Sequence, residues 1–290
     1  MNSQDKHYRM CLVNTLAEIG EAAWTELLQA QEKPTPFLSY AFLHALHESG
    51  SASPATGWRV CYLSIWQEQE QNPTLVAVMP LYEKNHSYGE YVFDWAWANA
   101  YHEHGLAYYP KLLSALPFTP VEGTRLLCRD ASAQAALIQA AQQLLTTKQY
   151  SSLHILFPTQ KEIETLQAAG FLIRQGLQFH WKNQNYRDFE DFLESLEKKK
   201  RKNIRAERRK VREAGIRFRH IRGKDINKEE WLFFKRCYDQ TYHEHRSSPY
   251  LNLDFFMRIG QTMPAHLLLI LAIRDDIPIA ASLLVHDQDT

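Results

Sequence analysis

One order of predicted elements occurs twice in this chain, and it constrains the fold more than any other feature. Hydrophobic periodicity over residues 1–185 predicts strand, helix, helix, strand, strand, and then further strands followed by helix, strand, helix and strand. Residues 216–285 predict the first five of these elements again, in the same order. A duplicated mixed α/β domain is the simplest account of this repeat.

The predicted elements set the domain boundaries. In the first copy we expect strands over 10–14, 58–66, 75–82, 91–97, 124–128, 152–157 and 171–181, and helices over 21–30, 37–48, 131–147 and 159–169. In the second copy we expect strands over 216–221, 266–273 and 279–285, and helices over 229–242 and 254–263. The prediction is an α/β (mixed α+β) fold with two tandem domains built on central mixed sheets, the first spanning 1–185.

Residues 186–290 are expected to hold a basic linking helix and the first half of the second domain. The second copy ends before equivalents of the later elements of the first. Its last predicted strand is then left without a neighbour, which is a liability for a sheet edge. We expect from this that the second domain is incomplete and that the chain lacks its C-terminal part.

The charge of the chain is segregated. Lys+Arg and Asp+Glu are both 33, so the formal net charge is zero. Residues 198–222 nevertheless hold 13 basic and two acidic residues, which gives this segment +11 and the remainder −11. So many positive charges in one segment repel one another unless an anion lies nearby. The anion is either a phosphate or carboxylate partner (tRNA, a nucleotide-linked precursor, CoA or an anionic membrane) or the acidic remainder of the same chain.

Simple counts exclude several classes of protein. The four cysteines form no C-x-x-C pair, so zinc-ribbon and thioredoxin-like chemistry is not expected. The polar N-terminus lacks the apolar core of a signal peptide, and the longest apolar run, 267–273, is too short to span a bilayer. We expect a cytoplasmic protein without a transmembrane segment. Neither G-x-S-x-G nor a P-loop motif occurs, which argues against serine and nucleotide hydrolases.

Three features of the sequence resemble known transferases. The predicted opening of strand, two helices and an antiparallel meander resembles the GNAT N-acetyltransferase topology. Residues 196–210, LEKKKRKNIRAERRK, with Gly215-Ile216 after them, resemble the K-x-R-x-N-I-R-x-A-x-K…G-[IV] stretch of FemAB-like peptidoglycan-bridge aminoacyltransferases. Residues 101–112, YHEHGLAYYPKL, followed by PFTP at 117–120, resemble a bacterial FemAB-like subfamily of predicted N-acyltransferases.

The resemblance implies two GNAT-like domains in tandem and a transferase activity. The acyl or aminoacyl group would come from acetyl-CoA or another acyl-CoA, or from an aminoacyl-tRNA, and would pass to an amine acceptor such as a peptidoglycan precursor. GNAT enzymes usually hold the CoA pyrophosphate at a helix N-terminus. The equivalent stretch of domain one, 128–134, has none of the glycines that let backbone approach a pyrophosphate. Domain one is therefore expected to be a poor CoA site.

The basic helix contains three candidate binding residues. Arg201, Asn203 and Arg205 match the family stretch best, so we expect them to contact a ligand or another part of the fold. The two interpretations, an anionic partner or a solvated helix against the acidic remainder, stay open on the sequence alone. If tRNA binds this helix, its affinity should fall by roughly 0.7–0.9 log units per log unit of salt for each neutralised phosphate.

Two His-Glu-His tripeptides provide candidate catalytic groups. Amine attack needs a proton acceptor whose pKa lies near the working pH, so Glu103, His104, Glu244 and His245 are candidate general bases. Histidines at i and i+2 share a face only on a strand, whereas zinc-binding helices use i and i+4, so we predict no metal site. The alternative is that these residues form local hydrogen bonds in loops.

An aromatic stretch between these motifs is a candidate substrate cleft. Aromatic side chains supply apolar walls and a few polar groups fix the ligand. The residues that we assign to this cleft are Asp94, Trp97, Asn99, Tyr109 and Lys111, whereas core packing is favoured for Phe93 and Trp95.

Two functions remain open. The leading hypothesis is an N-acyltransferase that works by positioning and one general base. The rival is a non-catalytic module that binds RNA or anionic lipid through the basic helix. Thermal stabilisation by acetyl-CoA or by tRNA would separate them.

Overall fold

The computed structural model describes residues 7–69, 72–288 and 290. We call residues 8–168 the N-terminal half and residues 189–285 the C-terminal half. The N-terminal half contains β1 (Tyr8–Val13), α1 (Glu21–Gln29), α2 (Tyr40–Glu48), β2 (Arg59–Val60), β3 (Tyr62–Gln67), β4 (Thr74–Met79), β5 (Tyr82–Lys84), α3 (Trp95–Glu103), β6 (Lys111–Ser114), β7 (Leu127–Cys128), α4 (Ala131–Lys148), β8 (Leu153–Ile155) and α5 (Gln160–Ala168). The C-terminal half contains α6 (Phe189–Glu194), α7 (Lys198–Glu213), β9 (Arg217–Arg222), α8 (Lys228–Glu244), α9 (Leu253–Thr262), β10 (Leu267–Arg274) and β11 (Ile277–Val285).

Polar capping residues set many of the helix starts. Ser39, Asp130 and Asn252 each accept a hydrogen bond from a backbone N–H in the first turn of α2, α4 and α9. Thr159 and Asn227 open α5 and α8 with reciprocal capping boxes. The sequence therefore contains local signals for where these helices begin.

The strands of the N-terminal half form two four-stranded sheets, β1-β3-β4-β7 and β2-β5-β6-β8. The first is antiparallel throughout, and the second is mixed because β6 and β8 run parallel. A hydrogen bond from Cys61 N to Leu81 O (2.9 Å) joins the two sheets where the 59–84 hairpin bends. α4 packs on β3 and β4 and buries an apolar face that includes Leu137 and Ala141.

The C-terminal half has the order of elements that opens the N-terminal half. β9, α8, α9, β10 and β11 follow one another, and β9, β10 and β11 form an antiparallel sheet in that spatial order. β1, α1, α2, β3 and β4 show the same succession and the same pairing order. The structure is thus a mixed α/β fold with a recurring unit, as the sequence predicts; the assignment of both units to GNAT-like domains stays a prediction.

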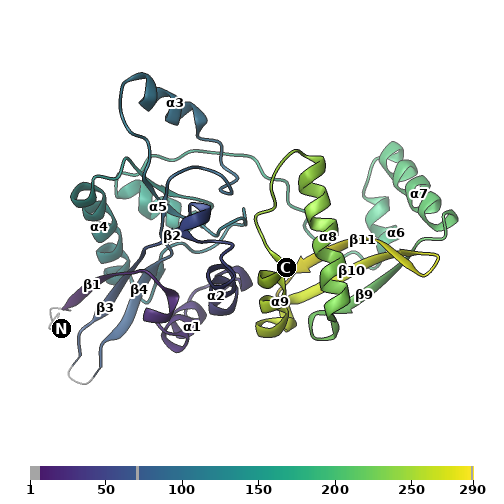
Figure 1. Cartoon of the computed structure of the whole chain (residues 1–290), viewed down its shortest axis with the longest axis horizontal. Helices are drawn as coiled ribbons and strands as arrows, with labels where there is room; N and C mark the ends of the chain where they lie inside the picture. The colour runs from purple at the N-terminus through teal and green to yellow at the C-terminus, as the bar shows by residue number, and fades with distance from the viewer. Residues whose placement is uncertain (1–6, 70–71, 289) are drawn as a thin grey trace.

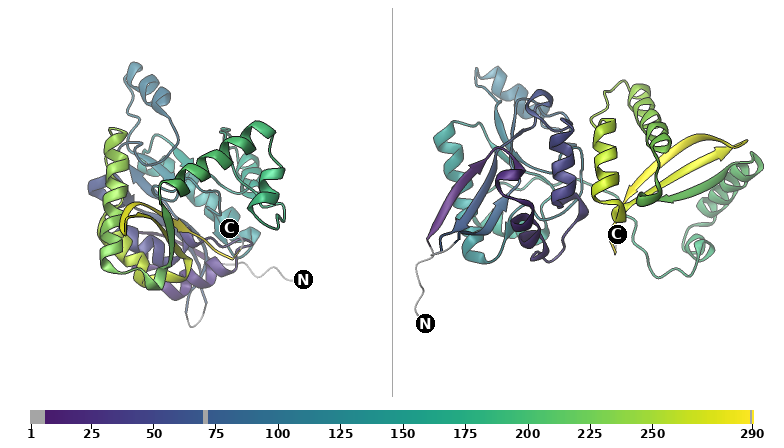
Figure 2. Two further views of the ribbon diagram at one scale, coloured as in Figure 1. Left: turned by 90° about the vertical axis from the view of Figure 1, so that its right-hand side faces the viewer. Right: turned by 60° about the horizontal axis from the view of Figure 1, so that its bottom comes forward.

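The two halves lie side by side, with α2 facing α9 (Figure 1). Phe42 of α2 packs edge-on against Phe255 of α9, with ring centroids 5.5 Å apart. Asn252 Nδ2 donates a hydrogen bond to Ser49 O at 2.6 Å. One hydrophobic cluster contains buried residues of both halves, so the junction is a packed interface. The right-hand view of Figure 2 shows the same separation of the halves from a further side.

Three parts of the structure differ from the sequence predictions. Residues 91–97 are not a strand: Trp97 and Ala98 donate their N–H groups to Asp94 O, and the alanine-rich stretch continues as α3. Residues 171–181 form no strand and pair with no described strand, so most of their apolar side chains stay exposed: Leu172, Ile173, Leu177, Phe179 and Trp181. The sheet of the C-terminal half is antiparallel instead of mixed, because the hairpin β10–β11 follows directly and no described crossover adds a parallel strand.

Candidate functional site at the junction of the halves

A cavity of about 420 Å³ lies where the two halves meet. The N-terminal half contributes Phe37, Phe42 and Thr119, and the C-terminal half contributes side chains from α8, α9 and β11. The lining residues of the C-terminal half are Phe234, Cys237, Tyr238, Thr241, Tyr242, Leu251, Phe255, Phe256, Ile259, Ala281, Ser282, Leu283 and Val285. A cavity of this size, formed by two halves of a chain, is a usual place for a ligand site.

The walls of the cavity are mostly aromatic and aliphatic, with a few hydroxyl groups. The hydroxyl-bearing residues are Thr119, Tyr238, Thr241, Tyr242 and Ser282. Tyr238 OH accepts a hydrogen bond from Leu251 N at 3.3 Å, so its position is fixed. Apolar walls with a small number of placed polar groups hold a substrate in one orientation and exclude water.

The sequence does not predict this cavity, although one signal for it is present. Phe234, Tyr238 and Tyr242 follow one another at intervals of four on α8, so they lie on one face of the helix. A tilted ring contact of 4.8 Å links Tyr238 to Tyr242, and an edge-on contact of 5.3 Å links Tyr238 to Phe256 of α9. An aromatic stripe of this kind more often marks a core, which is why the spacing alone does not identify a site.

Aromatic side chains of the two halves pack against one another beside the cavity. We call this group the aromatic bridge; it contains Trp58, Tyr91, Phe118, Tyr242 and Tyr250. The ring of Phe118 stacks on Tyr250 at 4.8 Å and touches Trp58 edge-on at 5.3 Å. Tyr91 and Tyr242 approach each other with hydroxyl oxygens 3.4 Å apart. Gly89 has φ +80, and a Cβ there would lie 2.6 Å from the Phe118 ring, so this position requires glycine.

Next to this bridge, the N-terminal half encloses a cluster of buried charges. Lys111 Nζ donates hydrogen bonds to Glu90 Oε2 at 2.9 Å, to Asp94 Oδ2 at 2.5 Å and to Ser87 Oγ at 2.9 Å. Tyr108 OH donates to Asp94 Oδ2 at 2.7 Å. The Lys111 side chain is 0% exposed and both carboxylates are 1% exposed, so these charges are compensated by one another and not by water.

Lys84 is a second buried cation beside this cluster. Its Nζ lies 3.7 Å from the centre of the Trp58 ring and donates a hydrogen bond to Tyr88 O at 3.3 Å. The pKa of Lys84 is lowered to about 7, chiefly by burial; the negative charge of Glu90 opposes this shift, and the positive charge of Lys111 adds to it. Lys84 thus connects the buried charges to the aromatic bridge through Trp58.

The environment also shifts the pKa of the groups that surround Lys111. Burial raises the pKa of Glu90, although Lys111 opposes the shift. Burial acts in the same direction on Asp94, but the hydrogen bonds from Lys111, Tyr108 and Ser87 outweigh it and leave the pKa of Asp94 below its usual range. Burial lowers the pKa of His154, which contacts Tyr108 OH, to about 4.

Glu90 Oε1, Asp94 Oδ1 and Trp58 Nε1 are buried and have no hydrogen-bond partner in the described structure. The cluster is closed to solvent, so its groups hold neighbouring residues in position. It fixes the 87–94 loop, which carries Gly89 and Tyr91 of the aromatic bridge. Sequence analysis missed Lys84, Glu90 and Tyr108, since nothing in their spacing indicates that they meet.

The structure brings three of the five residues of the predicted aromatic cleft together. Asp94 and Lys111 form the ion pair described above, and Tyr109 OH lies 2.8 Å from Ser87 Oγ. Trp97 and Asn99 lie apart from them, on the exposed helix α3. Asp94, Lys111 and Tyr109 therefore lie in or beside one largely buried network, and the contact of the five residues with a substrate stays a prediction.

The four candidate general bases lie at exposed helix ends. Glu103 and His104 end α3, where His104 N is bonded to Ala100 O. Glu244 and His245 end α8, one turn beyond Thr241 and Tyr242 of the cavity wall. The described residues contain no group of three or more His, Cys, Asp or Glu side chains that could hold a metal ion. The role of these four residues as bases stays a prediction.

The basic helix α7 has no buried residue and lies at the far end of the C-terminal half (Figure 1). Arg205 pairs with Glu190 at 2.6 Å, and Arg201 Nη1 donates to Glu194 O at 3.2 Å, so both contact α6, while Asn203 is exposed. Of the 13 basic residues in 198–222, four form ion pairs with acids in the described ranges: Arg205, Arg209, Arg217 and Arg219. Most cations of this segment therefore face solvent.

None of the curated proteins matches the chain. The family model named FemAB-like, described as peptidoglycan biosynthesis/recognition, matches residues 15–290 and so covers the N-terminal half, the junction cavity and the C-terminal half. Within the described residues, no helix is both long and apolar enough to cross a bilayer. The chain belongs to the FemAB-like family, which assigns it at a coarse level to the transferases of peptidoglycan biosynthesis.

Proposed function

We propose that this protein is an N-acyltransferase that modifies a cell-wall precursor. An acyl or aminoacyl group passes from a CoA thioester or an aminoacyl-tRNA to an amine of the acceptor. The observation that carries the proposal is the junction cavity of about 420 Å³, with its mostly apolar lining and a few hydroxyl-bearing residues, in a chain of a peptidoglycan family. Such a cavity can hold the two reactants together and keep water away from the reactive ester.

The chemical step needs a positioned amine and a proton acceptor. The amine nitrogen attacks the carbonyl carbon of the donor, a C–N bond forms, the C–S or C–O bond to the carrier breaks, and the carrier leaves with a proton. Glu244 and His245 are the bases that we favour, because they follow Tyr242 of the cavity wall by only a few residues. Glu103 and His104 on α3 are the second pair of candidates.

The acyl donor is either a CoA thioester or an aminoacyl-tRNA, and one feature of the structure bears on this choice. Asp130 Oδ1 accepts a hydrogen bond from Ala133 N at 2.9 Å at the start of α4. A carboxylate of the protein therefore takes the place at which a CoA pyrophosphate would meet this helix N-terminus. This supports the prediction that the N-terminal half is a poor CoA site, and leaves the junction cavity as the place to test.

Thermal stabilisation tests the donor and the function together. A donor that binds the folded protein at 100 times its Kd adds about 2.7 kcal/mol of stability, which raises the Tm by several degrees. We expect a shift with either acetyl-CoA or aminoacyl-tRNA, and transfer of the labelled group to an amine acceptor with the same donor. Absence of both a shift and transfer with either donor would contradict the proposal.

A second function is favoured by one specific observation. The cations of α7 that form no ion pair with an acidic residue of the described ranges would serve a non-catalytic module that binds a polyanion. This function predicts salt-sensitive binding of RNA or anionic lipid by the wild type, together with no transfer from any donor.

A further inference from the structure

The region around α3 forms an aromatic projection, which we define as Tyr88, Phe93, Trp95, Trp97 and Leu106. α3 has no buried residue and stands clear of the sheets at the top of Figure 1. Phe93 is 81% exposed, Trp97 50% and Leu106 60%. Large apolar side chains gathered on one exposed element usually mark an interaction surface.

The composition of the aromatic projection fits the interface of a lipid bilayer. Tryptophan and tyrosine concentrate at the level of the lipid headgroups, because their rings are apolar and their N–H or O–H groups are polar. Of the acidic residues between 87 and 107, Glu90 and Asp94 are buried and Glu103 is exposed. The surface of the projection thus presents a single carboxylate to an anionic membrane.

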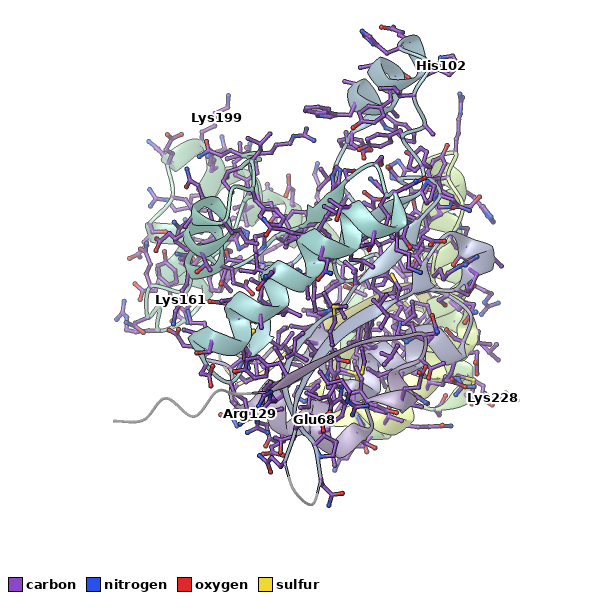
Figure 3. All side chains as sticks on the ribbon, turned by 90° about the vertical axis from the view of Figure 1, so that its left-hand side faces the viewer. Glu68, His102, Arg129, Lys161, Lys199 and Lys228 are labelled. Carbon is purple, nitrogen blue, oxygen red and sulfur yellow. The ribbon has the colours of Figure 1, made fainter. Side chains whose placement is uncertain are left out.

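A second element on the same side supplies positive charge. In Figure 3, His102 of α3 and Lys199 of α7 both stand at the upper side of the molecule, on two separate projections. Lys198, Lys199, Lys200 and Lys202 are exposed and form no ion pair with a described acidic residue. Cations near an anionic bilayer contribute about fivefold in affinity each.

We propose that this side of the protein docks on an anionic phospholipid bilayer. The aromatic projection enters the headgroup region, and the lysines at the start of α7 face the lipid phosphates. An RNA strand would need aromatic and basic groups interleaved along one groove, so that bases stack while phosphates are neutralised. Here the two kinds of side chain occupy separate projections, which favours a surface that extends in two dimensions.

Flotation with vesicles tests the proposal on the full chain. Wild type should bind vesicles that contain phosphatidylglycerol at least tenfold more tightly than vesicles of phosphatidylcholine alone. Trp95→Ala/Trp97→Ala should lose at least tenfold of this affinity. The control Leu177→Ala/Phe179→Ala removes side chains that are 80% and 93% exposed on the extended 171–181 segment, and should bind as the wild type does.

The role of α7 is tested with Lys199→Gln/Lys200→Gln, for which we expect a loss of about 25-fold that added salt abolishes. Three results would overturn the proposal. The first is equal vesicle affinity of the wild type and the Trp95/Trp97 variant, and the second is an equal loss of vesicle affinity in the Leu177/Phe179 control. The third is salt-sensitive binding of RNA without binding of vesicles. Vesicle binding involves no turnover. Its outcome is therefore separate from that of the acyl-transfer assay.

Discussion

Lys111 is stabilised in the interior by Glu90 and Asp94, and its removal would leave these two buried carboxylates without the ammonium group that both of them contact. Loss of one partner of a buried ion pair costs about 3–5 kcal/mol, since the remaining charge stays desolvated. We therefore expect Lys111→Met to lower the free energy of unfolding by this amount in urea titration.

Arg205→Ala is the matched control for Lys111→Met. It removes an ion pair to Glu190 that is exposed to solvent, so the loss should stay below about 1 kcal/mol. A Lys111 variant that is no less stable than the Arg205 variant would show that the buried network does not contribute to stability as the geometry indicates.

His47 and His154 make stability depend on pH. Burial lowers the pKa of each to about 4, below the ordinary value of 6.5 that applies to the unfolded chain. Between these values the unfolded state binds more protons. The free energy of unfolding should therefore fall as the pH drops from 6.5 to 4, by up to about 1.4 kcal/mol per pH unit for each histidine.

His154→Gln isolates one of these two contributions. Urea titrations at several pH values between 4 and 6.5 should give a shallower dependence for the variant than for the wild type. Parallel pH profiles would mean that His154 does not titrate in the way that its burial implies.

At the level of elements, α9 is the helix that joins the halves. Asn252 accepts a hydrogen bond from Phe255 N in the cap of α9, and its Nδ2 donates to Ser49 O across the junction. Asn252→Asp keeps the cap but removes the donor, so we expect a loss of about 0.5–1.5 kcal/mol for the missing hydrogen bond. The measurement is the midpoint of thermal or urea unfolding.

Asn227→Asp is the matched control, because Asn227 caps α8 in the same way. A carboxylate at a helix N-terminus is favourable, so this variant should be as stable as the wild type or slightly more stable. Equal changes of the unfolding midpoint for Asn252→Asp and Asn227→Asp would contradict a stabilising hydrogen bond across the junction.

Elements with regular periodicity and clear caps were predictable from the sequence. Both helices of each repeat, α4, and the end of the basic helix before Gly215, which has φ +68, lie close to their predicted places. The aromatic run at 91–97 favoured a strand, but the helix starting at Trp95 needs no neighbour to satisfy its backbone, whereas a strand does. The 171–181 segment alternates like a strand and finds no partner among the described strands.

The candidate site was predictable only in part, for a reason that applies to most sites built across a fold. Asp94, Tyr109 and Lys111 were found because they are close in sequence. Lys84 precedes this aromatic stretch and the cavity residues of α8 come from a distant segment, so only the tertiary fold brings them to the site. Sequence spacing contains no information about that approach.

For the whole molecule, the central claim is that the junction cavity is the place of acyl transfer. Ala281 of β11 lines the cavity, whereas its neighbour Ala280 is exposed. Alternation along the strand places the two side chains on opposite faces of the sheet. Tryptophan at 281 would fill the cavity, and tryptophan at 280 would point away from it.

The direct measurement is kcat/KM for transfer of a labelled acyl or aminoacyl group to an amine acceptor, for Ala281→Trp and Ala280→Trp beside the wild type. The account predicts at least a tenfold loss for Ala281→Trp, and wild-type transfer for Ala280→Trp, with melting of both variants still cooperative. Ala281→Leu, a smaller change, should give an intermediate loss. Full transfer by a folded Ala281→Trp protein would contradict the claim that the reaction takes place in the junction cavity.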